Sequence, residues 1–358
     1  MDFDFSFAFF DLEVFFALLL IAYLIAAVFT VSSLLIKPPH YAHRKPSEGL
    51  ALVGNPIDPV WQPFIHDPKT DFGLDYESVE FPALPIAPGV SSPTLRGWYL
   101  PRPAPKDGLR RGIVMVHGGG RDRREFLRFT PFLAKEGYEL LLFDCREHGI
   151  SDGSGRGFDW GRAMVFDVLG AVHYAKHHLK WDRLALQGVS NGAVLSVLAA
   201  AYEDGLIFDV HKTAPSINAL IIESPYRNVP QGMVDIMKAF LSSLPPAVAM
   251  LSLLPLLVRL VTIVARMRIK YRQDHRHVRP LPEVNIDTLV SHLSPRPALF
   301  IHGTRDNRFP TSFTEDLYAM YKHRKLLWIV PFGHHTECYD ADPALYEHRE
   351  RTFLRDHL

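Results

Sequence analysis

The sequence predicts an α/β protein with a mostly parallel central sheet, helices on both faces, an apolar cap insertion and an N-terminal transmembrane helix. From Asp75 onward, short apolar segments alternate with longer helical segments, which is typical of repeated β–α units. Most of the strand-like segments are predominantly apolar, as expected for parallel strands that are buried on both faces. One of them ends in Gly188-Val189-Ser190-Asn191-Gly192 and is followed at once by a helical run of small residues.

Composition limits the classes of protein that need to be considered. The chain has 358 residues, of which 47% are hydrophobic, so it can bury a sizeable core. Lys and Arg together number 39, as do Asp and Glu, and this balance lacks the basic excess typical of nucleic-acid-binding proteins. The two cysteines, Cys145 and Cys338, are too few for a disulfide framework.

The N-terminal segment is predicted to be a membrane anchor over residues 1–37. No charged side chain occurs in 14–36, and at about 1.5 Å per helical residue this run spans the roughly 30 Å hydrocarbon core of a bilayer. A cleaved signal peptide is the alternative. It is disfavoured because no Lys or Arg precedes the run, the run is too long, and no small-x-small cleavage site is evident.

The charges that flank this run predict its orientation. Acidic residues precede it, whereas Lys37, Arg44 and Lys45 follow it. Because positive residues favour the cytoplasmic side, we expect a single-pass protein whose C-terminal bulk faces the cytoplasm.

Residues 38–74 contain several prolines and little periodicity, which indicates a linker and lead-in to a domain at 75–358. In that domain, apolar runs of strand length are bounded by turn residues, and amphipathic runs separate them. Strands are expected at 76–81, 95–100, 112–116, 138–143, 183–187, 219–222, 298–302 and 326–330, and helices at 123–135, 158–178, 312–322 and 343–357.

A long insertion at about 225–293 separates two of these strands by far more than a usual crossover. It includes 239–258, an uncharged stretch that three prolines interrupt. A second transmembrane helix is the alternative to a cap, but one crossing there would put Ser190 and the later strands on opposite sides of the membrane. An apolar cap over the sheet edge is therefore expected. The basic residues in 266–279 are expected either on a solvated surface or against anionic lipid headgroups.

Ser190 is the predicted nucleophile. Glycines on both sides of a strand–turn–helix serine permit a strained turn that lifts the hydroxyl clear of the sheet. A serine hydroxyl needs a base, and the base needs an orienting carboxylate, each in a loop that follows a later strand. Asp306 follows the strand at 298–302, and His334 and His335 follow the strand at 326–330. His334 is favoured over His335 because it directly follows Gly333, where a tight turn would aim it at the serine.

The run His117-Gly118-Gly119-Gly120 follows the strand at 112–116 and leaves backbone N–H groups uncovered. We expect an oxyanion hole formed by the N–H groups of Gly119 and Asn191. A phosphate-binding loop is the competing interpretation, but both the Walker Lys-Ser/Thr and the dinucleotide spacing are missing. The pairs His275/His277 and His177/His178 lack metal-ligand spacing, so neither a metal nor a cofactor is expected.

Taken together, these motifs resemble the alpha/beta-hydrolase superfamily from Asp75 to the C-terminus. The motifs are the glycine run at 117–120, the segment at 144–153, the turn at 188–192, and 302–306 followed by 333–334. The segment at 144–153 is similar to the family's Asp-x-Arg-Gly-His-Gly-x-Ser turn, with Glu147 where glycine is usual. The nearest branch is similar to membrane-anchored lipases and serine aminopeptidases, and the resemblance implies a lid at the position of the insertion.

The resulting prediction is a membrane-anchored serine hydrolase that cleaves carboxylic esters through an acyl-enzyme. The resemblance implies Ser190 as nucleophile, His334 as base and Asp306 as its orienting acid. A cap beside a membrane favours a lipid-like or acyl ester substrate, with short or aryl esters compatible. The alternatives are a peptidase or thioesterase of the same fold, or a catalytically silent, membrane-anchored binding module. The sequence leaves the oligomeric state open.

Overall fold

The central feature is an eight-stranded sheet, found in the part of the chain that the computed structural model describes. The described residues are 5–38, 41, 43–50, 66–103, 105–157, 159–207, 216–242, 255–274 and 285–358. The strands are β1 (Glu77–Pro82), β2 (Thr94–Leu100), β3 (Arg111–Val116), β4 (Glu139–Asp144), β5 (Arg183–Val189), β6 (Ala219–Glu223), β7 (Ala298–Gly303) and β8 (Lys325–Val330).

The strand order is β1-β2-β4-β3-β5-β6-β7-β8. β2 pairs antiparallel with β1 and with β4, and the remaining neighbours are parallel. The mostly parallel sheet expected from the sequence is therefore confirmed. Because parallel strands end at the same edge, the loops that follow β3, β5 and β7 gather at one side of the sheet.

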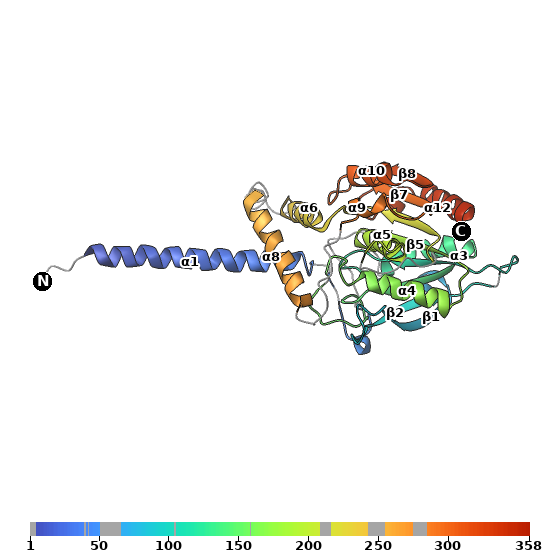
Figure 1. Ribbon diagram of the computed structural model, residues 1–358, viewed down its shortest axis with the longest axis horizontal. Helices are drawn as coiled ribbons and strands as arrows, with labels where there is room; N and C mark the ends of the chain where they lie inside the picture. Colours follow the sequence, from blue (N-terminus) through green and yellow to red (C-terminus); the bar gives the residue numbers. More distant parts are fainter. Residues whose placement is uncertain are drawn as a thin grey trace.

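Helices cover both faces of the sheet, as predicted (Figure 1). The strands serve two cores, since Val114 and Val116 of β3 join one apolar cluster while Ile113 and Met115 join the other. The first cluster includes α4 (Val165–His177), α5 (Asn191–Glu203) and α10 (Thr311–Met320), and the second includes α3 (Thr130–Lys135) and α12 (Pro343–His357). The shorter helical elements are η1 (Pro46–Glu48), α2 (Pro68–Phe72), η3 (Arg123–Phe129), α9 (Asp287–Val290) and α11 (Cys338–Ala341).

Two predicted helices differ from the structure. The expected helix at 123–135 is a 3₁₀ segment, η3, followed by the short α3. The expected helix at 158–178 begins only at Val165, and Phe158 lies outside the described residues. Before that start, the Asp159 carboxylate accepts hydrogen bonds from the N–H groups of Gly161 and Ala163, and Trp160 has a φ of 58°. This side-chain-capped turn competes with helix formation.

Among the described residues, the predicted cap region between β6 and β7 contains two long helices and the short α9. α6 (Val229–Ser242) and α8 (Pro255–Asp274) pack against each other, and α8 also packs against the N-terminal helix α1 (Phe5–Leu34). Most of the uncharged stretch at 239–258 lies outside the described residues, which resume at Pro255. Figure 1 shows α8 crossing α1 where α1 meets the domain.

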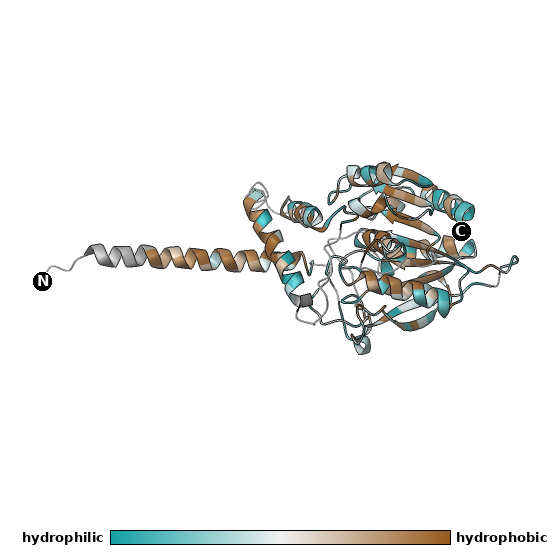
Figure 2. Ribbon diagram, in the orientation of Figure 1, coloured by the Kyte–Doolittle hydropathy of each residue, from teal (hydrophilic) through white to brown (hydrophobic). Residues whose placement is uncertain are grey.

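α1 extends away from the domain as a single helix. Within the described residues, its segment Val14–Leu34 alone is long and apolar enough to cross a membrane, and only 6% of its most apolar window is buried. Figure 2 shows the segment Val14–Leu34 as predominantly apolar along its length. Its C-terminal end is anchored in the domain, where Leu35 and Ile36 are each 1% exposed and belong to the core.

Candidate active site

Ser190 stands at a strained turn between β5 and α5. Its φ of 53° and ψ of −118° lie in a region that side chains other than glycine rarely adopt. The flanking glycines are required by close backbone contacts: a Cβ on Gly192 would lie 1.8 Å from the carbonyl oxygen of Val116, and a Cβ on Gly188 would lie 2.3 Å from that of Gly192. The N–H of Ser190 donates to the carbonyl of Glu223 at 2.8 Å. These contacts hold the serine at the carboxyl edge of the sheet.

A hydrogen-bonded array connects Ser190 to Asp306 through His335. Nε2 of His335 lies 3.0 Å from Oγ of Ser190, and Nδ1 lies 2.7 Å from Oδ2 of Asp306. Because an ionised carboxylate only accepts hydrogen bonds, Nδ1 carries the proton and Nε2 accepts the hydrogen bond from the serine hydroxyl. The array has the connectivity that a base and its orienting acid need.

The expectation that His334 faces the serine is wrong. The His334 side chain is exposed, whereas His335 is buried. The loop after β8 reverses through Phe332, whose φ is 63°, and the His334 carbonyl accepts a hydrogen bond from the Glu337 N–H. Gly333 does form a tight contact, since its carbonyl oxygen would lie 2.1 Å from a Cβ on Gly303. That contact joins the loops after β7 and β8, but it is His335, and not His334, that points toward the serine.

Every oxygen of the Asp306 carboxylate is occupied. Oδ1 accepts the N–H groups of Arg308 and Phe309, and Oδ2 faces both His335 and Nε2 of His302, the latter at 3.1 Å. Burial alone would raise the pKa of Asp306, but the charge and hydrogen bonds of His335 and His302 outweigh it and hold this pKa well below its usual range. The carboxylate therefore stays ionised next to the base.

Burial controls the protonation of His335. It lowers the pKa of the imidazole below its usual value, and attraction to Asp306 offsets this effect only in part. The ring also packs edge-on against Phe309, with the ring centres 5.2 Å apart. His335 is consequently held neutral at neutral pH, the form that accepts a proton.

The glycine loop after β3 lies beside Ser190, since a Cβ on Gly118 would be 3.4 Å from that of Ser190. The Gly118 N–H donates to Glu125 at 2.6 Å, and the Gly120 N–H donates to Nε2 of His148 at 3.0 Å. Gly119, the predicted oxyanion donor, is thus held between two anchored neighbours. Asn191, the other predicted donor, opens α5, where a backbone N–H has no intrahelical acceptor.

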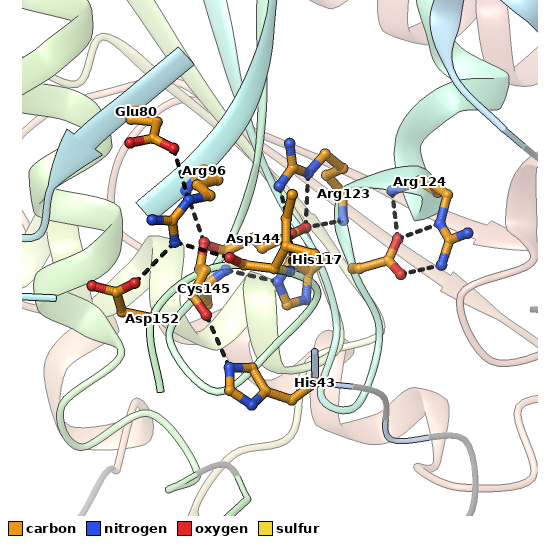
Figure 3. A network of polar contacts seen from close by, with 12 residues as sticks. His43, Glu80, Arg96, His117, Arg123, Arg124, Asp144, Cys145 and Asp152 are labelled. Carbon is orange, nitrogen blue, oxygen red and sulfur yellow. Dashed lines mark hydrogen bonds and ion pairs between the residues drawn. The ribbon is translucent and has the colours of Figure 1, made fainter. Parts of the chain in front are cut away.

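A buried polar network fixes the loops behind this site (Figure 3). Asp144, at the end of β4, accepts hydrogen bonds from the backbone and guanidinium of Arg123, and both side chains are almost fully buried. Nε2 of His117 accepts the Cys145 N–H at 3.0 Å. Burial lowers the pKa of His148 to about 3, so it stays neutral and its Nε2 remains an acceptor for Gly120. The network ties the β4 turn to the glycine loop.

Glu147 explains how the turn after β4 tolerates a residue where glycine is usual. Its φ of 64° is in the left-handed region, which costs a non-glycine residue about 1–2 kcal/mol. Its carboxylate offsets this strain by accepting hydrogen bonds from the N–H groups of Ser154 and Arg156. The change of residue type therefore leaves the turn intact.

A second chain of contacts connects α1 to the serine turn. Nε1 of Trp160 donates to the carbonyl of Leu35 at 2.7 Å, at the base of α1. The hydroxyl of Tyr226 lies 3.2 Å from the Trp160 carbonyl and 2.8 Å from Oδ1 of Asn191. Trp160 and Tyr226 are each 1% exposed, so these are interior contacts that position the residue after the serine.

A cavity of about 470 Å³ lies next to Asp306, between α6 and the loop after β7. Its walls combine apolar and neutral polar side chains with two basic and two acidic ones. The lining residues are Asp235, Lys238, Ala239, Ser242, Asp306, Asn307, Arg308, Phe309 and Pro310. The described residues contain no group of three or more His, Cys, Asp or Glu residues arranged to hold a metal ion. His275 and His277 lie outside the described residues.

Sequence reasoning missed several residues that build the site. His302 was identified only as part of a motif, although its position four residues before Asp306 could have indicated a partner. Glu125 and Tyr226 carry no sequence signal that separates them from other polar residues. Their contacts with Gly118 and Asn191 arise from the packing of distant segments.

Comparisons with known proteins identify the family of the chain. The sequence profile of the family described as "Serine aminopeptidase, S33" matches residues 108–342, which is more than half of the chain. The chain therefore belongs to this family of alpha/beta-hydrolases. The uncharacterized protein YqkD of Bacillus subtilis is 26% identical over 295 residues, covering 80% of this chain and 84% of that protein.

Solved structures share the fold. The Pyrococcus furiosus esterase Pf2001 superposes with a TM-score of 0.59 and 21% identity, covering 88% of this chain and 99% of that chain. A bacterial membrane phospholipase A superposes with a TM-score of 0.52 and 18% identity, covering 79% of this chain and 86% of that chain. At these identities the likeness is one of fold.

The Asp144–Arg123 pair yields a stability prediction. Asp144→Asn leaves the Arg123 charge buried without its partner and is expected to lower the free energy of unfolding by about 3–5 kcal/mol. Denaturant unfolding of the detergent-solubilised protein measures this effect. Asp107→Asn removes an exposed ion pair with Arg111 and serves as the matched control, with no measurable change expected. Equal unfolding midpoints for the two variants would contradict the role given to the buried pair.

Proposed function

We propose that this member of the serine aminopeptidase S33 family is a membrane-anchored serine hydrolase that cleaves carboxylic esters through an acyl-enzyme. The observation that carries the proposal is the array of Ser190, His335 and Asp306 at 3.0 Å and 2.7 Å. The array lies in an alpha/beta-hydrolase fold, next to a cavity and an apolar cap region. No cofactor is needed for this chemistry.

The reaction proceeds in two acyl-transfer steps. Oγ of Ser190 attacks the ester carbonyl while Nε2 of His335 takes its proton, and Asp306 stabilises the imidazolium that forms. The imidazolium then protonates the leaving alcohol as the tetrahedral intermediate collapses. Water then attacks the acyl-serine while His335 takes its proton. The imidazolium returns this proton to Oγ of Ser190 as the acid is released, which restores the serine and the neutral base. His335 takes the role that the sequence prediction gave to His334.

The N–H groups of Asn191 and Gly119 are proposed to hold the oxyanion. Asn191 is positioned at the start of α5 by its contact with Tyr226, and the glycine loop is held through Glu125 and His148. Fixed donors of this kind stabilise the developing charge without having to reorganise, and the loss of one typically costs about 3–4 kcal/mol of transition-state stabilisation.

A lipid-like or other acyl ester fits the cavity better than an aminopeptidase substrate. An aminopeptidase must bind the free α-ammonium group of a peptide, which calls for an available carboxylate. Among the described lining residues, Asp306 is occupied by His335 and His302, and Asp235 accepts hydrogen bonds from Gln231. Lys238 and Arg308 balance these two carboxylates in charge, so the lining offers no surplus negative charge for an ammonium group. The fold likeness to an esterase and a phospholipase accords with this choice.

Membrane anchoring by α1 is supported by the way its base packs into the domain. A cleaved signal peptide is removed from the mature protein. Here the residues that end the apolar run, Leu35 and Ile36, are core residues, and Leu35 accepts the Trp160 indole hydrogen bond. Large side chains along the outer part of α1 are exposed, such as Tyr23 at 70%, which calls for lipid around them. The basic residues after the span favour the cytoplasmic side for the domain, and we propose this orientation.

Covalent labelling tests the array. A fluorophosphonate probe is expected to label the detergent-solubilised wild type and not Ser190→Ala, because the serine oxygen attacks the phosphorus. His335→Ala should slow labelling by about 10²–10⁴-fold through loss of the base. His334→Ala is the matched control, with an unchanged rate expected.

Two outcomes of this experiment would contradict the account. Slow labelling in His334→Ala together with normal labelling in His335→Ala would return the base to His334. A folded wild type that does not label would favour a membrane-anchored binding module without hydrolase activity.

The pH dependence follows from the lowered pKa of His335. The base acts in its neutral form, so a lowered pKa keeps it active at more acidic pH, and activity is lost only as pH falls through the folded-state value. The acidic limb of kcat/KM for a chromogenic ester should therefore have its midpoint below the usual histidine value of about 6.5. His334→Ala should leave this midpoint unchanged. A midpoint above that value would show that burial does not control the protonation of the base.

A further inference from the structure

One face of α8 exposes a row of large apolar side chains. Leu256, Leu260, Ile263, Met267 and Tyr271 are between 46% and 81% exposed. Their spacing of three or four residues places them on one stripe along the helix, which we call the outer stripe. Exposed apolar rows of this kind mark sites of contact with a partner or a membrane.

The opposite face of α8 packs on the protein. Val258, Val261, Ala265 and Ile269 are at most 3% exposed and belong to the core of the domain. The outer stripe therefore points away from the domain. Figure 1 shows that α1 also runs away from the domain past α8. A stripe that points away from the domain therefore lies on the side on which α1 continues.

Arg268 fixes the level at which α8 crosses α1. Its Nη1 donates to the carbonyl of Phe29 at 2.9 Å and to the hydroxyls of Ser32 and Ser33 at 2.7 and 2.9 Å. Its guanidinium lies 4.0 Å from the centre of the Phe29 ring. These residues form the last turns of the apolar segment Val14–Leu34. A span of that length fills the hydrocarbon core, so α8 is held at the membrane boundary.

The charges on α8 match such a boundary. The helix contains five basic residues and one acidic residue, Asp274, at its end. Arg259 and Lys270 are exposed next to the outer stripe. Apolar side chains flanked by Lys and Arg are typical of helices that lie in the headgroup region of anionic membranes.

We infer that α8 lies in the plane of the membrane, with its outer stripe inserted into the leaflet next to α1 and Arg259 and Lys270 on anionic headgroups. The inference rests on the proposed anchoring by α1 and adds a second membrane contact. α6 packs on α8 and lines the cavity next to Asp306. The contact therefore holds the cavity close to the leaflet, where a lipid ester can reach the site without crossing water.

Site-specific labelling in vesicles tests this inference with the full-length protein. Cys145 and Cys338 are buried, so a cysteine introduced at the surface can be labelled selectively with a fluorescent probe. The variants are Ile263→Cys and Met267→Cys on the outer stripe, Ile21→Cys on α1, and Leu109→Cys as the aqueous control. Leu109 is exposed and precedes the amino end of β3, whereas the site lies at the carboxyl end of the parallel strands. An unchanged thermal unfolding temperature verifies each fold.

The vesicles contain phosphatidylcholine and phosphatidylglycerol, with spin-labelled lipid or aqueous iodide as quencher. The lipid quencher should act on probes at Ile263, Met267 and Ile21, and iodide should act on the probe at Leu109. Iodide quenching at Ile263 and Met267 with lipid quenching at Ile21 would overturn the inference and leave the anchor standing. Lipid quenching absent at Ile21 would overturn the anchor itself.

Two further outcomes concern the occupant and the charges. Protection of Ile263 and Met267 from both quenchers would mean that protein covers the stripe, a second copy or another partner, and would overturn the lipid assignment. In vesicles of phosphatidylcholine alone, lipid quenching at both positions is expected to be weaker, because Arg259 and Lys270 then have no anionic headgroups to bind. Equal quenching in the two compositions would overturn the headgroup contact.

Discussion

The close approach of the turn at Ser190 to the end of β3 is the constraint on which the site depends. Gly192 lies against the Val116 carbonyl so tightly that any Cβ would collide with it, and Val116 directly precedes the glycine loop. The same contact therefore fixes the relative positions of the serine, the start of α5 and the loop proposed to supply an oxyanion donor. The strained backbone at Ser190 persists because the neighbouring strands hold it on both sides. β3 contacts the turn through Val116, and β6 accepts the Ser190 N–H through Glu223.

A comparable contact organises the other half of the site. Gly303 and Gly333 bring the loops after β7 and β8 together, and this contact delivers Asp306 and His335 to the serine. Behind them, His302 and two backbone N–H groups saturate the carboxylate. The base is thus buried and neutral beside an anion that is already satisfied. Trp160 and Tyr226 connect Asn191, the residue after the serine, to the base of α1.

Much of this architecture could be predicted from the sequence, because local patterns determine it. Apolar strand runs located the strands within a residue or two, and the glycines around Ser190 indicated the strained turn. The choice between His334 and His335 failed because it depends on the positive φ of Phe332. An aromatic residue rarely adopts this conformation, so the sequence gives no sign of it. The late start of α4 depends on the turn formed by Asp159. The contacts of Tyr226 and Glu125 are made between segments far apart in the chain, and the sequence alone does not reveal them.

The central claim is that Ser190 forms a covalent acyl intermediate with an ester substrate. Acid quenching of the detergent-solubilised protein within its first turnovers of a chromogenic ester, followed by peptide mass mapping, tests this claim most directly. The account predicts the mass of the acyl group on the peptide that contains Ser190, together with an initial burst of released alcohol. Linear alcohol release from the first turnover, with no acyl adduct or with the adduct on another residue, would contradict it.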